Sequence, residues 1–560
     1  MSSYPDAFNP DLLSRIPLDA NTVMDVGCAT GALGAAYRRF NPRARLLGID
    51  IDAEAAAIAT TRLDDVAIVD VEANPLPFAT PGGIDCILYG DVLEHLRDPW
   101  QLLRQHSRAL SERGTMILCV PNVEHWSFAA NLLRGTWDYE DTGLFDRSHL
   151  RWFSLETMRR GLIENGLALC DVAPRIFDAE QCDAFTQAIT PALQSLGVDP
   201  AAYAGRAAPL QYVWRVRKRA QTRMTIAANM LAPVGGVSQV RVLNPLAAMS
   251  TDASVTAQLS GAPVPGGDAD DPRVFILHRP ALAGEQGLAV LRKLRRDGWL
   301  VVTEFDDHPD FLPMMQAETS YSFTAVHAVQ TSTPALGDLL RQRNPEVAVF
   351  PNAIRALPDV VNFADPNRMK LFFGALNREQ DWVALMPTLN VVANALGDRL
   401  AFCVVHDRGF FDALETPHKQ FTSTCDYATY LKLLGSCELS LMPLRDTPFN
   451  RAKSDLKFIE AASCRVVSLA SHIVYAGSID DGCNGLLFAT PEELRLRLLR
   501  LAAMPDMARG IADAARKYVS KERMLAYQTG ARIAWYRSLW DRREALTEAL
   551  EDRLRLAAPA

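Results

Sequence analysis

The chain has 560 residues, of which 49% are hydrophobic and 22% charged, ordinary values for a globular protein of about three to four domains. Its net charge of -8 argues against a nucleic-acid-binding protein, because such binding depends on a surplus of Lys and Arg. The short basic run Arg215–Arg219 stays compatible with an anionic or membrane contact, although a strand end running into a linker explains it more simply.

The cysteines and the N-terminal segment bear on the cellular compartment. The ten cysteines form no CxxC pair and no Cys/His ligand spacing, which predicts reduced thiols and no zinc site. Met1–Pro10 has no basic segment followed by an apolar run, so no signal peptide is expected. No run reaches about 18 uninterrupted apolar residues, so no membrane-spanning helix is expected. We expect a cytoplasmic protein, and a peripheral membrane contact stays open.

Short apolar runs alternate with amphipathic stretches along the chain, a pattern typical of βα units and parallel sheets. In the first series the last two strands suit antiparallel edge strands. The series has expected strands at Thr22–Val26, Leu46–Ile49, Ala67–Val69, Cys86–Tyr89, Met116–Val120, Leu167–Val172 and Gln211–Val216. The polar run Arg217–Arg223 then indicates a domain boundary.

Two further series follow, separated by the polar stretch Phe363–Lys370. Ala253–Asp271 is rich in Gly, Pro and Asp and is expected to be partly loop, and Pro491–Leu556 is expected to be helical. The predicted fold class is α/β with three Rossmann-like domains, at residues 1–220, 221–365 and 366–560. The expected strands are Met224–Asn229, Val274–His278, Leu300–Phe305, Ala325–Gln330, Val347–Phe350, Leu371–Gly374, Leu400–Val405, Leu439–Met442, Val466–Leu469 and Gly485–Phe488.

A glycine-containing turn follows the first expected strand, in Asp25-Val-Gly-Cys-Ala-Thr-Gly31. Gly27 and Gly31 allow tight turning and close approach of a ligand to a helix N-terminus. Asp50 ends the second strand, where a carboxylate can accept both hydroxyls of a ribose. Asp70, after the third strand, is placed to accept from an adenine amino group. The three features together indicate a nucleoside-binding site.

Residues 20–219 resemble class I S-adenosylmethionine-dependent methyltransferases in this turn, in Gly48-Ile-Asp50, in Leu76-Pro-Phe78 and in Tyr89-Gly-Asp-Val-Leu-Glu-His-Leu96. The resemblance implies that the two glycines border the methionine moiety of the cofactor, with Ala29 standing where many members have glycine. The segment from Gly135 to Phe153 resembles an insert over the active site of O-methyltransferase-like enzymes of bacterial surface-polysaccharide clusters. The expected cofactor-binding residues are Asp25, Gly27, Gly31, Asp50, Asp70 and Asp91.

Methyl transfer to a hydroxyl needs a base for the departing proton. His149, His95 and Asp146 are the candidate catalytic residues. A structural role remains the alternative for each histidine, and no metal is expected in this domain.

In the second half, Phe449–Ala462 carries polar residues at the start of a predicted helix. Asn450, Lys453 and Ser454 offer a cation and hydrogen-bond donors to a diphosphate, and Glu460 can reach a ribose. A solvated helix face is the alternative. A Gly-Gly turn ending at Gly236 opens another predicted helix and can approach a phosphate or sugar.

Residues 224–540 resemble retaining GT-B glycosyltransferases of the family-four type, in the subgroup with an Asn-x-x-Lys-Ser-x-x-Lys-x-x-Glu block, which here also contains Lys457. The resemblance implies a nucleotide-sugar donor (UDP-, GDP- or dTDP-linked) held mainly by the third domain. It implies no obligatory metal, since Lys453 and Arg378 can stabilise the leaving diphosphate. Ala452 stands where most of the wider family has glutamate, so Ser454 or Asp455 is left to contact the donor sugar.

Acceptor binding is expected at His278, Asp306 and Asp307, although Asp306-Asp-His308 also suits a metal. The sequence thus predicts a bifunctional methyltransferase and glycosyltransferase acting on a glycan or lipid-linked glycan, with no nucleic-acid partner. Two alternatives stay open. The GT-B half can be a non-catalytic glycan-binding module, or the methyltransferase can act on an unrelated small molecule.

Overall fold

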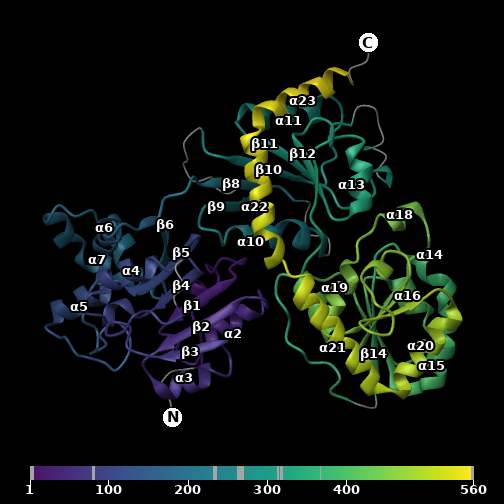
Figure 1. Cartoon of the computed structure of the whole chain (residues 1–560), viewed down its shortest axis with the longest axis horizontal. Coiled ribbons are helices and arrows are strands. Elements are labelled where there is room, and N and C mark those ends of the chain that lie inside the picture. Colours follow the sequence, from purple (N-terminus) through teal and green to yellow (C-terminus); the bar gives the residue numbers. More distant parts are fainter. Residues whose placement is uncertain are drawn as a thin grey trace. The chain divides into compact units, whose positions relative to one another are not determined.

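The computed structural model describes residues 6–78, 82–230, 236–260, 270–311, 315, 320–365 and 368–556. These residues form three sheets, one of seven strands and two of six, with helices around each (Figure 1). The chain divides into two compact units, the first holding the seven-stranded sheet and the second both six-stranded sheets. The predicted fold class, α/β with three Rossmann-like domains, is confirmed. The three domain boundaries stay a prediction.

The sheet of the first unit has the order β3-β2-β1-β4-β5-β7-β6. Strands β1 to β5 are parallel, and β7 runs antiparallel to both β5 and β6. The two late strands, β6 and β7, form antiparallel pairs as expected, but only β6 lies at an edge of the sheet. The strands are β1 (Thr22–Val26), β2 (Arg45–Asp50), β3 (Asp65–Ile68), β4 (Ile84–Gly90), β5 (Leu110–Pro121), β6 (Ala168–Arg175) and β7 (Gln211–Arg217). The helices are α1 (Pro10–Leu13), α2 (Ala32–Arg38), α3 (Ala53–Ala59), η1 (Leu93–His95), α4 (Pro99–Ser107), α5 (Trp126–Arg134), α6 (Leu155–Glu164), α7 (Ala179–Ser195) and α8 (Pro200–Ala207).

Strand β1 shows why this sheet is stable and where a ligand would bind. It buries Val23 in one apolar cluster and Met24 in another, so both faces of the sheet are covered, as in most parallel sheets. Because β2 lies on one side of β1 and β4 on the other, the strand order reverses at this point. Ligands of open α/β sheets bind beyond the carboxyl ends of the strands at such a reversal.

The second unit begins with a sheet of order β13-β12-β11-β10-β8-β9. The strands are β8 (Met224–Ala228), β9 (Val255–Leu259), β10 (Arg273–His278), β11 (Leu300–Glu304), β12 (Ala328–Thr331) and β13 (Val347–Val349). The helices are α9 (Gly236–Ser238), the π-helical η2 (Gln239–Leu243), α10 (Asn244–Met249), α11 (Gly284–Arg296), η3 (Pro309–Phe311) and α13 (Pro334–Arg341). Pro233–Gly235 of the predicted Gly-Gly turn and 261–269 of the predicted loop lie outside the described residues.

The other sheet of this unit is wholly parallel, with the order β16-β15-β14-β17-β18-β19. The strands are β14 (Met369–Gly374), β15 (Leu400–Val405), β16 (Lys419–Thr422), β17 (Leu439–Met442), β18 (Val467–Ser471) and β19 (Leu486–Phe488). The helices are α14 (Glu379–Trp382), η4 (Val383–Leu385), α15 (Met386–Leu396), η5 (Gly397–Arg399), α16 (Arg408–Ala413), α17 (Tyr427–Gly435), α18 (Pro448–Arg451), α19 (Leu456–Ser463) and η6 (Tyr475–Gly477).

The C-terminal region is helical, as the sequence predicts, with α20 (Pro491–Ala503), α21 (Pro505–Glu522), α22 (Ala526–Asp541) and α23 (Arg543–Leu556). Helix α22 returns to the first sheet of the unit, where it contacts β10 and α10 (Figure 1). Its Tyr536 hydroxyl donates to Gln330 Oε1 over 2.5 Å. We call the part of the second unit around each six-stranded sheet a lobe. The chain passes from the first lobe to the other and returns to the first through α22. Among the described residues, no helix is both long and apolar enough to traverse a bilayer.

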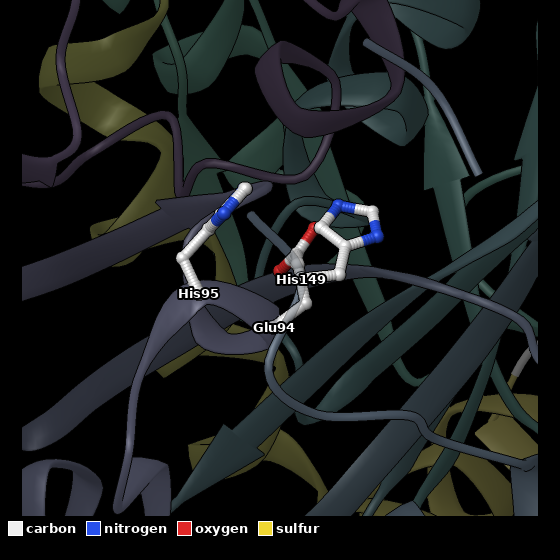
Figure 2. A group of neighbouring side chains, drawn as sticks. All are labelled: Glu94, His95 and His149. Carbon is white, nitrogen blue, oxygen red and sulfur yellow. The ribbon is translucent and has the colours of Figure 1, made fainter. Parts of the chain in front are cut away.

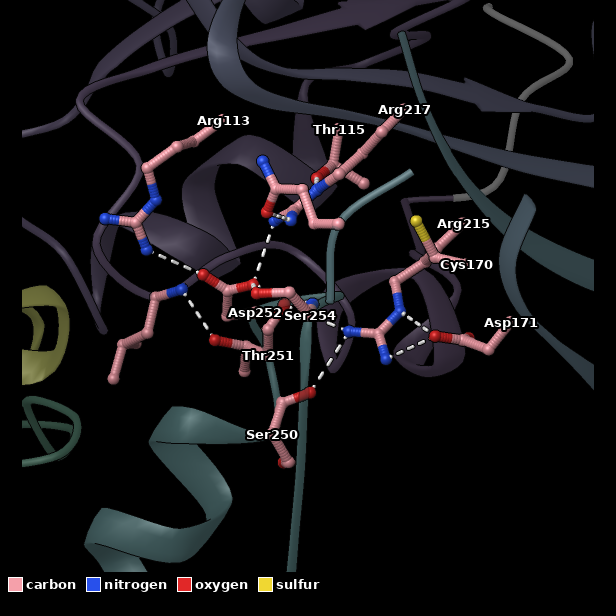
Figure 3. A network of polar contacts seen from close by, with 12 residues as sticks. Arg113, Thr115, Cys170, Asp171, Arg215, Arg217, Ser250, Thr251, Asp252 and Ser254 are labelled. Carbon is pink, nitrogen blue, oxygen red and sulfur yellow. Dashed lines mark hydrogen bonds and ion pairs between the residues drawn. The ribbon is translucent and has the colours of Figure 1, made fainter. Parts of the chain in front are cut away.

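A short segment far along the sequence belongs to the first unit. Residues Ser250–Val255 follow α10 yet cluster with residues 43–222. Asp252 forms ion pairs with Arg217 (2.9 Å) and Arg113 (2.7 Å), and Arg217 and Asp252 are 3% and 4% exposed (Figure 3). Arg215 donates to the backbone oxygens of Ser250 and Thr251. Burial alone would raise the pKa of Asp252, but the Arg217 charge holds it well below its usual value.

Candidate functional site

The turn after β1 has the backbone geometry that the glycine motif predicts. Gly27 and Gly31 adopt φ angles of +77° and +75°, which favour glycine. The backbone nitrogens of Gly27 and Cys28 donate to Ile49 O at 2.8 and 3.0 Å. The turn is thereby fixed to the carboxyl end of β2.

Asp50 completes this turn through its side chain. Its Oδ2 accepts from Ala29 N at 2.7 Å and its Oδ1 from Asp52 N at 2.9 Å. Ala29 adopts a φ of +46°, a left-handed conformation that costs an alanine more backbone strain than a glycine. The carboxylate therefore holds the turn in its left-handed conformation and lies beside it.

We expect Gly27→Ala to lower the free energy of unfolding by about 2–4 kcal/mol, because its Cβ would lie 2.5 Å from Val92 Cγ2 and the backbone strain adds to that clash. Gly82→Ala is the matched control, since its φ is +73° and no atom lies within 4 Å of the new Cβ. It should lose only about 1 kcal/mol. Urea unfolding of the full chain measures both, and equal losses would contradict the steric explanation.

The other expected cofactor residues lie around the same edge of the sheet. Asp25 is buried near the end of β1, and burial with the nearby Asp50 charge raises its pKa to about 8. Asp70 is exposed after β3 and accepts from Glu72 N at 2.9 Å. Asp91 follows β4 in a left-handed conformation and accepts a hydrogen bond from the Gln211 amide. Their roles toward a cofactor stay predictions.

The raised pKa of Asp25 predicts a pH dependence of stability. Between its unfolded pKa of about 4 and the folded value of about 8, only the folded state keeps the proton, so stability falls as pH rises, by up to about 1.4 kcal/mol per unit. Asp25→Asn should flatten this slope. Urea midpoints between about pH 5 and pH 8 test it, with the exposed Asp65→Asn as control. Parallel slopes for the wild type and Asp25→Asn would contradict the assignment.

Beyond β4, the chain brings together two of the predicted catalytic residues. The rings of His95 in η1 and His149 lie 4.9 Å apart, centre to centre. Ser148 Oγ lies 3.1 Å from His95 Nδ1 and 2.5 Å from Asp146 Oδ1. His95, His149 and Asp146, the three candidate catalytic residues, thus lie in one cluster. Their roles as bases stay a prediction.

Glu94 joins this cluster, and the sequence analysis assigned it no role. One ligand atom from each of Glu94, His95 and His149 lies within 4.8 Å of the others, and Figure 2 shows the three side chains close together. Glu94 is 1% exposed, and burial with the charges of Asp91 and Asp146 raises its pKa well above the usual value. The Glu-His pair in the sequence is a local signal, but its meaning depends on His149, which only the fold brings near.

An aromatic group adjoins the cluster at the predicted insert. Phe128 of α5 contacts Trp137, Phe145 and Trp152, with ring centres 5.7, 4.7 and 5.3 Å away. Trp152 lies 5.7 Å from the His149 ring. The insert therefore places an apolar wall beside the histidines.

The second unit contains a cavity of about 190 Å³ between its two lobes. Arg279, Asp306 and Asn352 line it from the first lobe. Four of the predicted donor residues line it from the other lobe, namely Arg378, Lys453, Ser454 and Lys457. The side chains proposed from separate parts of the sequence thus meet at one place.

Two polar contacts join the lobes beside this cavity. Lys453 Nζ lies 2.7 Å from Asp307 Oδ1, and Asn352 Nδ2 donates to Ser454 Oγ at 2.7 Å. Gly236 approaches the other lobe closely, since a Cβ there would lie 2.8 Å from Tyr427 Cε2. Of these contacts, the Lys453–Asp307 pair joins a predicted donor residue to a predicted acceptor residue.

Asn450, Lys457 and Glu460, also among the predicted donor residues, are held by neighbouring groups. Asn450 accepts from Arg378 at 2.8 Å and donates to Asp381 Oδ1 at 2.9 Å. Lys457 donates to Gly374 O, and burial with the Arg378 charge lowers its pKa to about 8. Glu460 accepts from the Tyr427 hydroxyl at 2.9 Å, and burial raises its pKa to about 7.

The acceptor candidates lie on the first lobe. Asp306 pairs with Arg279 at 2.7 Å, and Asp307 lies 3.7 Å from the same guanidinium. His278 is buried, and within the described part of the chain neither of its ring nitrogens has a hydrogen-bond partner. Asp381, Tyr427 and Asn352 were not predicted, and each has a partner distant in the sequence, respectively Asn450, Glu460 and Ser454.

Residues 3–172 match the family model described as a methyltransferase domain. Among curated proteins, the chain is 31% identical over 153 residues to a ubiquinone biosynthesis O-methyltransferase of Xanthomonas campestris, covering 24% of this chain and 63% of that protein. It is 29% identical over 113 residues to a trans-aconitate 2-methyltransferase of Afipia carboxidovorans, covering 20% and 43%. The matches thus span less than two thirds of these relatives.

Solved structures resemble the chain weakly. TarM of S. aureus matches with a TM-score of 0.37 and 14% identity, over 48% of this chain and 54% of that chain. A putative methyltransferase from Bacillus halodurans matches with a TM-score of 0.26 and 17% identity, over 38% of this chain and all of that chain. Likenesses at this level do not bear on activity.

Proposed function

We propose that the first unit transfers a methyl group from S-adenosylmethionine to a hydroxyl. The observation that carries the proposal is Asp50, whose carboxylate is fixed by two backbone amides beside the Gly27–Gly31 turn at the reversal of the strand order. The methyltransferase-domain match over residues 3–172 supports it. His95, His149 and Asp146 are close enough to one another to serve as a group around the acceptor.

The test is calorimetric titration of the full chain with S-adenosylmethionine and with its demethylated product. Saturable binding of one molecule per chain is the expected result. Isotope-labelled methyl donor, supplied with hydroxyl-bearing glycans and with small hydroxyl compounds, then identifies the acceptor. A folded chain that binds neither the cofactor nor its product would refute the proposal.

We propose further that the second unit is a retaining glycosyltransferase using a nucleotide-sugar, with residues 221–365 as the acceptor lobe and 366–560 as the donor lobe. Support comes from Lys453 and Arg378, two cations that line the cavity between the lobes. Cations at this position can stabilise a leaving diphosphate. Both units would then act on one glycan of a bacterial surface polysaccharide, in the cytoplasm or at its membrane.

For the second unit, a specific observation favours an alternative function, that of a glycan-binding module without transfer activity. Ala452 replaces the acidic residue of the wider family, and no other carboxylate of that loop takes its place freely. Asp455 is paired with Arg523 over 2.5 Å. Glu460 is hydrogen-bonded to Tyr427. Slow hydrolysis of a bound nucleotide-sugar by the full chain would decide for the transferase.

We expect Lys453→Ala to weaken binding of a nucleoside diphosphate by about 10- to 100-fold, because a charge-assisted hydrogen bond is lost. Lys432→Ala, at an exposed lysine of α17, is the matched control and should leave affinity unchanged. Calorimetry with UDP, GDP and dTDP measures both. Equal affinities of the wild type and Lys453→Ala for the nucleoside diphosphate would show that Lys453 does not contribute to donor binding.

A further inference from the structure

The first unit contains a set of metal-ligand side chains, two of which have buried polar atoms without a hydrogen-bond partner in the described part of the chain. Glu94 is 1% exposed, and within the described residues neither of its carboxylate oxygens has a hydrogen-bond partner. His149 Nδ1 is likewise buried and without a partner in that part of the chain. Burying such groups unpaired is costly, and a bound cation would compensate for that cost.

We propose that Glu94, His95 and His149 bind one divalent transition-metal ion. The ligand atoms lie within 4.8 Å of one another, close enough to share an ion to which each would bond at about 2.0–2.2 Å (Figure 2). Two imidazoles and one carboxylate suit Zn²⁺, Co²⁺, Fe²⁺ or Mn²⁺ better than Ca²⁺, which prefers oxygen ligands alone. Three protein ligands leave coordination positions open, as in catalytic metal sites.

The site lies next to the proposed cofactor turn. Glu94 and His95 lie in η1, which begins three residues after the end of β4, the neighbour of β1 in the sheet. A Cβ at Gly27 would come within 2.5 Å of Val92, two residues before Glu94. The outer side of the cluster carries polar groups as well, since Ser148 contacts His95 and Asp146. Such neighbours commonly orient a metal-ligating imidazole.

This placement assigns the ion a role that rests on the proposed methyl transfer. An acceptor hydroxyl bound at an open position would lose its proton to water more readily, because the ion stabilises the alkoxide. The alkoxide oxygen then forms a bond to the methyl carbon while the bond from that carbon to the sulfonium sulfur breaks, which leaves a neutral thioether. The substrate class is thus a molecule whose hydroxyl can bind a metal ion.

The test is titration of the chelator-treated full chain with Co²⁺ alone, followed by its visible absorption and by calorimetry. We expect one ion per chain with micromolar affinity, displaced by Zn²⁺. Glu94→Gln and His149→Asn should each weaken binding by about 100-fold or more. His472→Gln, at an exposed histidine of the second unit, should have no effect. Far-UV circular dichroism and S-adenosylmethionine binding show whether each variant is folded.

The outcomes separate this inference from the proposed function. No Co²⁺ or Zn²⁺ binding by a chain that still binds S-adenosylmethionine would refute the metal site and leave methyl transfer intact. Binding that survives in both Glu94→Gln and His149→Asn would refute it too, since the ion would then lie elsewhere. Stoichiometric binding lost in both variants, in a chain without methyl transfer activity, would support the site and refute the proposed function.

Discussion

Replacing Asp50 by alanine is expected to weaken S-adenosylmethionine binding by about 100-fold or more. The substitution would remove the proposed charged hydrogen bonds to the ribose, each of which would contribute about 1.5–3 kcal/mol. The substitution would also remove the 2.7 Å hydrogen bond from Ala29 N to Asp50 Oδ2, which stabilises the left-handed backbone of Ala29. Calorimetric titration of the full chain measures the loss, and circular dichroism confirms that the variant is folded.

Asp70→Asn is the comparison for this result. Asp70 is exposed and its Oδ1 accepts from Glu72 N, a bond that an asparagine oxygen can keep. A loss of only a few-fold is expected, because the substitution removes a charge and leaves the acceptor. If the two variants bind equally well, Asp50 has no special role and the predicted ribose contact is wrong.

Asp252→Ala is expected to lower the free energy of unfolding of the first unit by about 3–5 kcal/mol. The substitution leaves Arg217 buried without its partner, and an uncompensated buried charge has a cost of that size. Arg113 and the backbone nitrogen of Ser254 lose a partner as well. Urea unfolding monitored by S-adenosylmethionine binding reports on this unit within the full chain.

Asp65→Ala tests whether burial causes the effect. Asp65 pairs with Arg45 over 2.6 Å, but the two side chains are 46% and 57% exposed. Exposed pairs contribute about 0–1 kcal/mol, so this variant should unfold almost as the wild type does. A similar loss in both variants would show that the burial of the Arg217–Asp252 pair has no special consequence.

The sequence predicts the parallel strands well because each is a short apolar run bounded by turns, and β1, β15 and β17 begin and end at the expected residues. Two strands were missed for physical reasons. The segment of β9 (Val255–Leu259) is too mixed in composition to stand out, and β16 (Lys419–Thr422) is a short edge strand with few buried residues.

Some parts of the candidate sites could likewise be predicted from the sequence, and others could not. The glycine turn and Asp50 form a local pattern with a fixed spacing, so their proximity could be predicted. The proximity of Glu94 to His149, of Glu460 to Tyr427 and of Lys453 to Asp307 depends on tertiary packing. A single sequence carries no signal for such pairs, and for that reason Glu94 and Tyr427 were not among the predicted residues.

The position of Ser250–Val255 in the first unit has a consequence for dividing the protein. The chain leaves that unit at Thr222, contributes β8 and α10 to the second unit, returns for these few residues and leaves again. A fragment ending at Thr222 would lack Asp252, the partner of Arg217. A fragment ending at Val255 would contain β8 but not β10, with which β8 pairs in the first sheet of the second unit. The two units are therefore interleaved in the sequence, not joined in tandem, and no single cleavage site releases two intact halves.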